Sequence, residues 1–181
     1  DPLLQAYSLS ESSVLRTSTI VIEIDSDDVE DYESLHTITA QLRYGDNPWF
    51  ASLLTEMWYD SSEDRWETNF TPANSSELGT YDLRIMVNDT DGGSSNWNTY
   101  EDVITVTNND PTLQYHELSS SSVLRTDTIV LGIDVMDIED AEDSHTLEVQ
   151  SRASIGGGWY AGYFSTLWYN SSDSRGETNF T

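Results

Sequence analysis

The stretch LGTYDLRIMVNDTDGG, residues 78–93, decides the fold class. Within it Tyr81, Leu83, Ile85 and Val87 occupy every second position. Apolar residues with a period of two predict a β-strand that buries one face. The Asn, Asp and Gly residues that follow are typical of a tight turn. This segment is therefore expected to be a strand that ends in an acidic loop.

The same alternation continues outward along the chain. It occurs in Thr19–Ile24 and in Asp102–Thr107, and the joining segments are rich in Asp, Asn, Ser and Gly. No segment has the pattern of an amphipathic helix. The strands expected before the junction near residue 109 are roughly 3–7, 18–25, 36–44, 50–59, 65–70, 80–88 and 100–107. Seven short strands in about 100 residues predict an all-β immunoglobulin-like sandwich.

One residue adds a local signature to this prediction. Tyr81 opens the sixth expected strand in the context Leu78-Gly79-Thr80-Tyr81. A tyrosine at that place fits a tyrosine corner, in which the hydroxyl bonds back to the preceding turn. The alternative is an ordinary buried tyrosine.

An internal repeat sets the domain organisation. SSVLRT at 12–17 recurs at 121–126, and EDRWETNFT at 63–71 returns as DSRGETNFT at 173–181. The repeat predicts two tandem modules, 1–109 and 110–181. The second has no counterpart of Pro72–Asn109 and so lacks its last two strands. Two explanations stay open: a cropped view of a longer array, or a sheet completed by a neighbouring chain.

Composition limits the classes of partner. The chain has 33 acidic and 7 basic residues, a net charge of −26, no lysine and no cysteine. Nucleic acid is excluded as a partner because binding it requires a basic surface. The absence of cysteine excludes a disulfide scaffold. No apolar run approaches the roughly 20 residues that a membrane span requires, so this segment is not expected to insert.

Acidic residues recur at fixed spacing after the second strand of each copy. Ca²⁺ prefers six to eight oxygen ligands from irregular loops, so these acids and those of two further loops are candidate calcium ligands. A solvated acidic surface is the alternative, and the spacing does not match an EF-hand loop. The candidates are Asp25, Asp28, Glu30, Asp31, Asp89, Asp91, Asp110, Asp134, Asp137, Glu139 and Asp140.

Aromatic residues are also retained between the copies. Trp49, Trp58 and Tyr59 recur as Trp159, Trp168 and Tyr169. We expect them to fill the space between the sheets, with a carbohydrate-stacking platform as the alternative. Trp66 is replaced by Gly176, which favours a surface role for Trp66.

Five Asn-X-Ser/Thr triplets favour an N-glycosylated surface protein. The motif is weak singly, and several copies are expected by chance in so polar a chain. The acceptors are Asn69, Asn74, Asn88, Asn170 and Asn179.

No catalytic motif is evident, so we do not expect an enzyme. There is no nucleophile elbow, phosphate loop or zinc-protease motif in the sequence. His36 and His145 occupy equivalent positions at the start of the third strand, where a hydrogen-bonded strand residue is expected and not a catalytic base. A glycosidase carboxylate pair is a remote alternative.

Three segments together resemble a known class of repeat. The IDxxDxED…HT pattern, LGTYDLRIMVNDTDGG and the closing VITVTNNDP resemble cadherin-like and polycystic-kidney-disease-type immunoglobulin-fold repeats of prokaryotic, particularly archaeal, cell-surface proteins. The resemblance implies a structural extracellular protein that forms a filament, stalk or surface layer from further copies of itself. It also implies that calcium stiffens junctions through residues such as Asp110. An adhesion or carbohydrate-binding module, using Trp66, Trp97 and the acidic loops, is the alternative.

Overall fold

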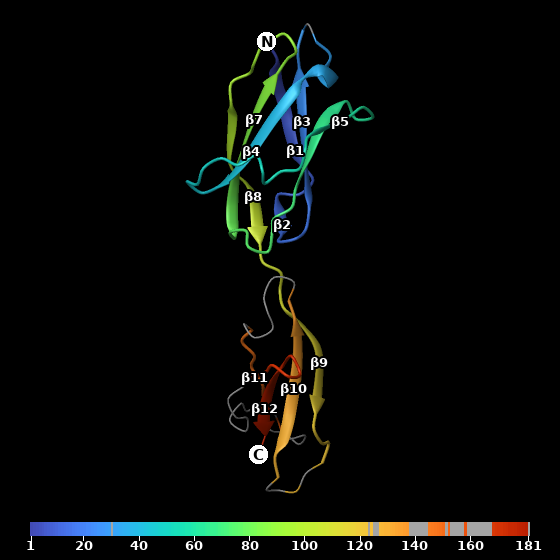
Figure 1. Cartoon of the computed structure of the whole chain (residues 1–181), viewed down its shortest axis with the longest axis vertical. Coiled ribbons are helices and arrows are strands. Elements are labelled where there is room, and N and C mark those ends of the chain that lie inside the picture. Colours follow the sequence, from blue (N-terminus) through green and yellow to red (C-terminus); the bar gives the residue numbers. More distant parts are fainter. Residues whose placement is uncertain are drawn as a thin grey trace. The chain divides into compact units, whose positions relative to one another are not determined.

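The computed structural model describes residues 1–29, 31–122, 124, 127–137, 145–150, 152, 158 and 168–180. Regular structure in these residues is β-strand apart from one 3-10 turn, η1 (Glu33–Leu35), which confirms the predicted all-β class (Figure 1). The chain divides into two compact units, Asp1–Asn108 and Asn109–Thr181. Within the described ranges no helix is long and apolar enough to cross a membrane.

The described part of the first unit contains two four-stranded sheets. One has the order β1-β3-β6-β5 and the other β2-β8-β7-β4. The strands are β1 (Leu3–Leu9), β2 (Ser13–Leu15), β3 (Ile20–Asp27), β4 (Thr37–Tyr44), β5 (Trp58–Asp60), β6 (Arg65–Phe70), β7 (Gly79–Asn88) and β8 (Asn98–Thr107). Pairing is antiparallel except between β2 and β8, which run parallel.

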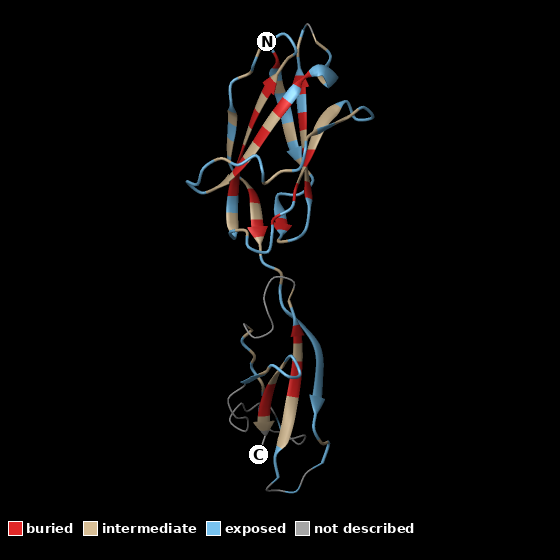
Figure 2. Cartoon of the chain, in the orientation of Figure 1, coloured by how far each residue is buried: buried red, intermediate tan, exposed pale blue. Residues whose placement is uncertain are grey.

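The alternating apolar residues of both sheets form one core. Antiparallel pairing of β4 with β7 places Leu42 opposite Leu83, and both side chains are fully buried. The strands of both sheets contribute to this core (Figure 2). Residues with 0% exposure include Ile22, Ile24, Leu42, Leu83, Ile85, Val87 and Ile104. Burial of aliphatic side chains of this size is the main favourable term for folding.

The predicted strand at 50–59 is largely wrong. Only β5 forms there, while Phe50 and Leu54 make isolated bridges to β4 and β6. Leu53, Leu54 and Met57 pack against the core from irregular backbone, so the segment is apolar without being extended. Seven strands were predicted for the first unit, whereas its described residues form eight. The additional strand is β2, which is too short to show a period although its Val14 is only 4% exposed.

The expected hydrogen bond of Tyr81 is present. Its side chain is 4% exposed, and the hydroxyl donates to the backbone carbonyl of Glu77 at 3.0 Å. The centroid of its ring lies 5.6 Å from the ring centroid of Phe70 and 5.4 Å from that of Tyr44. Tyr81 therefore ties the turn before β7 to the core.

The described part of the second unit contains one four-stranded sheet of order β11-β12-β10-β9. Its strands are β9 (Thr112–Leu118), β10 (Ile129–Met136), β11 (Trp168–Asn170) and β12 (Arg175–Phe180). The registers match those of the first unit position by position: Leu131 opposes Leu118 as Ile22 opposes Leu9, and Ile129 opposes Phe180 as Ile20 opposes Phe70. The sequence repeat is thus a repeat of sheet geometry.

Candidate functional site

The acids of the first unit gather where β3 and β7 end. Thr90, in the loop after β7, donates from its hydroxyl to the Asp31 carboxylate at 3.1 Å, which joins the two acidic loops. Asp31 is half-buried and Asp91 is exposed. Asp89 accepts hydrogen bonds from the backbone N–H of Asp91 at 3.0 Å and of Gly93 at 2.6 Å. The loop after β7 is therefore folded around one of its own carboxylates.

Two carboxylates lie close to Gly93. A Cβ at Gly93 would lie 2.2 Å from Asp89 Oδ2 and 2.8 Å from Asp1 Oδ1. Asp28 is close to the same end: its side chain is 3% exposed, and Oδ2 lies 3.7 Å from the amino group of Asp1. Acidic side chains from three separated segments thus come together at one end of this unit.

Glu33 is half-buried among other acidic groups. Its pKa is raised, first by burial and then by the charges of Asp25 and Asp64, against the lowering effect of the hydrogen bond from Ser26 N–H, which measures 2.9 Å. Tyr59 donates to Asp64, and this bond is the main reason that the pKa of Tyr59 rises to about 12. Glu33, Tyr59 and Asp64 border an open cleft of about 610 Å³ that also includes Asp28 and Asp31.

The candidate ligands do not form a ready metal cage. Among the described residues no group of three or more His, Asp or Glu side chains has suitable geometry. Asp25 and Asp110 are exposed, and Asp134 is half-buried on β10. Glu30, Glu139 and Asp140 lie outside the described residues. The calcium site stays a prediction, supported by where the acids converge.

The two equivalent histidines have different partners. His36 is 2% exposed, follows η1 directly, and its Nδ1 lies 2.8 Å from Ser26 Oγ. Val135 replaces Ser26 in the second copy, and there His145 Nε2 lies 3.8 Å from Asp137. The Asp137 side chain is 1% exposed. The hydrogen-bonded role expected for His36 is confirmed, although it precedes β4 rather than lying in it.

The prediction that the retained aromatics fill the core is wrong for Trp58, Trp168 and Tyr169, whereas Tyr59 is half-buried and Trp159 lies outside the described residues. Trp58 is 39% exposed and Trp168 is 40% exposed, because strand alternation directs them to the outer face opposite Glu67 and Glu177. Trp66, expected at the surface, is half-buried at the edge of the core, and its indole N–H donates to the Glu33 carbonyl at 3.0 Å.

Trp49 belongs instead to a stack on the outer face of the β2-β8-β7-β4 sheet. The guanidinium carbon of Arg84 lies 4.7 Å from the Trp49 ring and 4.2 Å from the Trp97 ring. Arg43 lies 4.5 Å from Trp49 and pairs with Asp82 at 2.7 Å, while Gln41 accepts from Arg84 Nε at 2.8 Å. Sequence reasoning missed this stack; the outward positions of Gln41, Arg43 and Arg84 on paired strands were its only signal.

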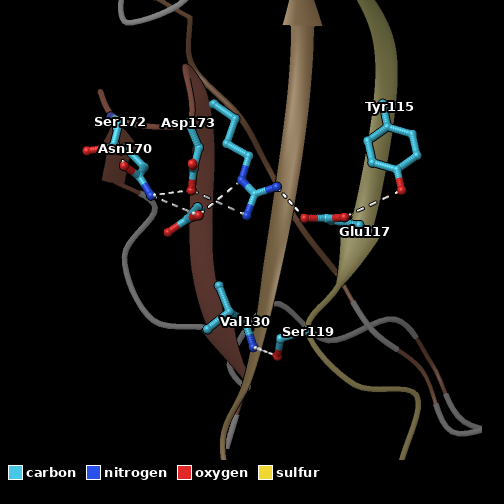
Figure 3. A network of polar contacts seen from close by, with 9 residues as sticks. Tyr115, Glu117, Ser119, Val130, Asn170, Ser172 and Asp173 are labelled. Carbon is cyan, nitrogen blue, oxygen red and sulfur yellow. Dashed lines mark hydrogen bonds and ion pairs between the residues drawn. The ribbon is translucent and has the colours of Figure 1, made fainter.

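The outer face of the second unit carries its own charge network (Figure 3). Arg175 on β12 pairs with Glu117 on β9 and with Glu177 at 3.0 Å. Asn170 donates to Asp173 and to Glu177, each at 3.1 Å. This acceptor of a predicted glycan is therefore held inside the network.

The other predicted glycan acceptors also differ in access. Asn74 is exposed in the turn segment before β7. Asn69 and Asn179 are half-buried within β6 and β12, and Asn88 accepts from Ser94 at 2.8 Å at the end of β7. Asn74 is thus the most accessible acceptor.

A scan against protein-family models finds no match to this chain, and a search of curated proteins also finds no match.

Proposed function

We propose that this chain is a structural, non-enzymatic extracellular protein whose immunoglobulin-like modules build a filament, stalk or surface layer. The observation that carries the proposal is the repetition of one sheet, in the same register, in two compact units. Tandem units of this kind suit a protein that builds an extended structure. Its partners are further copies of itself, and its location is the cell surface.

The strand order supports an immunoglobulin-like identity for the first unit. Sheets of order β1-β3-β6-β5 and β2-β8-β7-β4 correspond to the A-B-E-D and C-F-G sheets of that sandwich. The hydrogen bond from Tyr81 to Glu77 corresponds to the tyrosine corner. The second unit's sheet corresponds to A-B-E-D alone.

Electron microscopy of the purified chain in millimolar calcium tests the structural role. We expect fibres or ordered layers whose repeat reflects the module. A chain that stays monomeric at high concentration, with and without calcium, would argue against self-assembly.

Calcium is proposed to bind where the acids meet, and its proposed ligands in the first unit are Asp28, Asp31 and Asp89. At 10 mM Ca²⁺, a site typical of extracellular modules adds about 1.4–2.7 kcal/mol of stability. Thermal melting in calcium and in chelator measures this. Asp28→Asn and Asp137→Asn should remove the effect in their own units, whereas equal melting temperatures for the unaltered protein would reject the site.

A carbohydrate-binding role is the second candidate, favoured only by the exposure of Trp58 and Trp97. Arg84 already covers one face of Trp97, which leaves less of that ring for a sugar. Glycan-array binding that disappears in Trp58→Ala or in Trp97→Ala would favour this role.

A further inference from the structure

The second unit presents an apolar groove on the inner face of its sheet. Ile133 and Val135 on β10 are each 8% exposed, while Leu113 on β9 is 63% exposed. With Leu131, Leu147 and Val149 they line an open groove of about 700 Å³. Over residues 145–150, half-buried and exposed positions alternate, with Leu147 and Val149 half-buried. That alternation is typical of a chain with one inward face.

The first unit shows what occupies the equivalent place. Residues 147 and 149 correspond to Ile38 and Ala40 of β4, which pair with Val87 and Ile85 of β7. Those two β7 residues are 0% exposed and share one core with Ile22 and Ile24, the equivalents of Leu131 and Ile133. In the first unit, β7 fills the corresponding space.

Two exposed polar residues of the second unit match the outer side of such a strand. Gln150 and Arg152 correspond in sequence to Gln41 and Arg43. In the first unit Gln41 accepts from Arg84 and Arg43 pairs with Asp82, both on β7. The second copy thus retains the residues that bind an outward Asp-X-Arg pattern.

We infer that the groove accepts one extended strand of the β7 type, supplied by a further repeat of this kind. The strand carries aliphatic residues at alternate inward positions and an aspartate and an arginine on its outward side. It runs antiparallel to residues 146–150, as β7 runs to β4. Only the source of the strand, a further repeat, rests on the proposed function.

A synthetic peptide of residues 78–89 tests it against the full 181-residue chain. Titration by fluorescence anisotropy should show binding with one peptide per chain. A peptide with Asp82→Arg and Arg84→Asp has the same composition and net charge, and should bind about tenfold more weakly because its new arginine faces Arg152 and Gln150 loses its guanidinium partner. A peptide with Leu83→Ala should lose about thirtyfold or more, as expected for an inward leucine.

Substitutions in the chain locate the peptide. Leu147→Asp places a charge in the groove and should abolish binding, whereas Thr146→Asp adds the same charge at an exposed position and should change affinity less than about threefold. The charge-exchanged peptide should regain affinity for the Arg152→Asp chain. Absence of binding by the unaltered peptide, or equal binding of the two charge isomers, would overturn the inference. The inference would also be overturned if sedimentation shows that the chain forms a dimer, that the dimer excludes the peptide, and that Leu147→Asp dissociates it. Fibres seen without peptide binding would leave the structural role standing and reject only the strand.

Discussion

Replacing Tyr81 with phenylalanine removes one hydroxyl and keeps the ring that packs between Tyr44 and Phe70. The lost hydrogen bond to Glu77 measures 3.0 Å. Such a bond contributes about 0.5–1.5 kcal/mol net. For a domain of this size, the first unit's melting temperature should fall by about 4–8 °C per kcal/mol. Calorimetry of the full chain measures the change, and Tyr7→Phe is the control because the described structure shows no hydrogen bond from the Tyr7 hydroxyl.

The pH dependence gives this prediction a second test. Burial, followed by the charge of Glu77, raises the pKa of Tyr81 in the folded protein. A raised pKa favours the neutral phenol, so its contribution is fully present below the unfolded value of about 10 and declines as pH rises above it. The variant has no phenol to ionise. The stability difference between wild type and Tyr81→Phe should therefore shrink above pH 10. A difference that stays constant to pH 11, or a substitution without effect at pH 7, would refute a stabilising role for the Tyr81 hydrogen bond.

Three further substitutions, two of them with a comparison variant, probe the first unit. Gly79→Ala should cost about 2–3 kcal/mol in urea unfolding, because Gly79 has φ +124° and its Cβ would lie 3.1 Å from Tyr44 Cε2; Gly45→Ala, at φ +52° with open space, should cost only about 1 kcal/mol. Arg84→Met should lower stability by about 1–2 kcal/mol by removing the contacts with both tryptophan rings, and a change within error would show that the stack is passive. Asn74→Gln should remove most of any glycan mass from protein expressed in a glycosylating host, and a larger loss in Asn69→Gln would contradict the accessibility argument.

The period of two predicted the strands well where a strand is long and has one buried face. Expected spans 80–88 and 100–107 appear as β7 and β8, each within two residues. Periodicity could not reveal β2, whose three residues are held by parallel pairing with distant β8. It also could not distinguish an extended apolar segment from Leu53 and Leu54, which reach the core from a turn.

The candidate site was harder to predict because its geometry depends on contacts between distant segments. The spacing of acids after β3 indicated which carboxylates persist, but not that Thr90 would join Asp31 or that Asp64 would approach Glu33. Retention of Trp58 indicated importance but not direction. Its outward orientation follows from the register of β5 with β6, which places Trp58 opposite Glu67 and which the sequence alone does not specify.

The arginines on the sheet faces show that an interaction can persist while its residues change position. Arg65 on β6 pairs with Glu23 on β3 at 2.8 Å. The equivalent Arg175 faces Gly132, where a Cβ would lie 2.8 Å from its guanidinium carbon, and it pairs instead with Glu117 on β9. Glu117 stands where the first copy has Ser8, which donates to Glu23. The acid has therefore moved by one strand, and the glycine makes room for the arginine to reach it. A comparison of the copies position by position treats both exchanges as surface drift, whereas the sheet geometry shows an arginine–glutamate ion pair in both units, between neighbouring strands in the first and across β10 in the second.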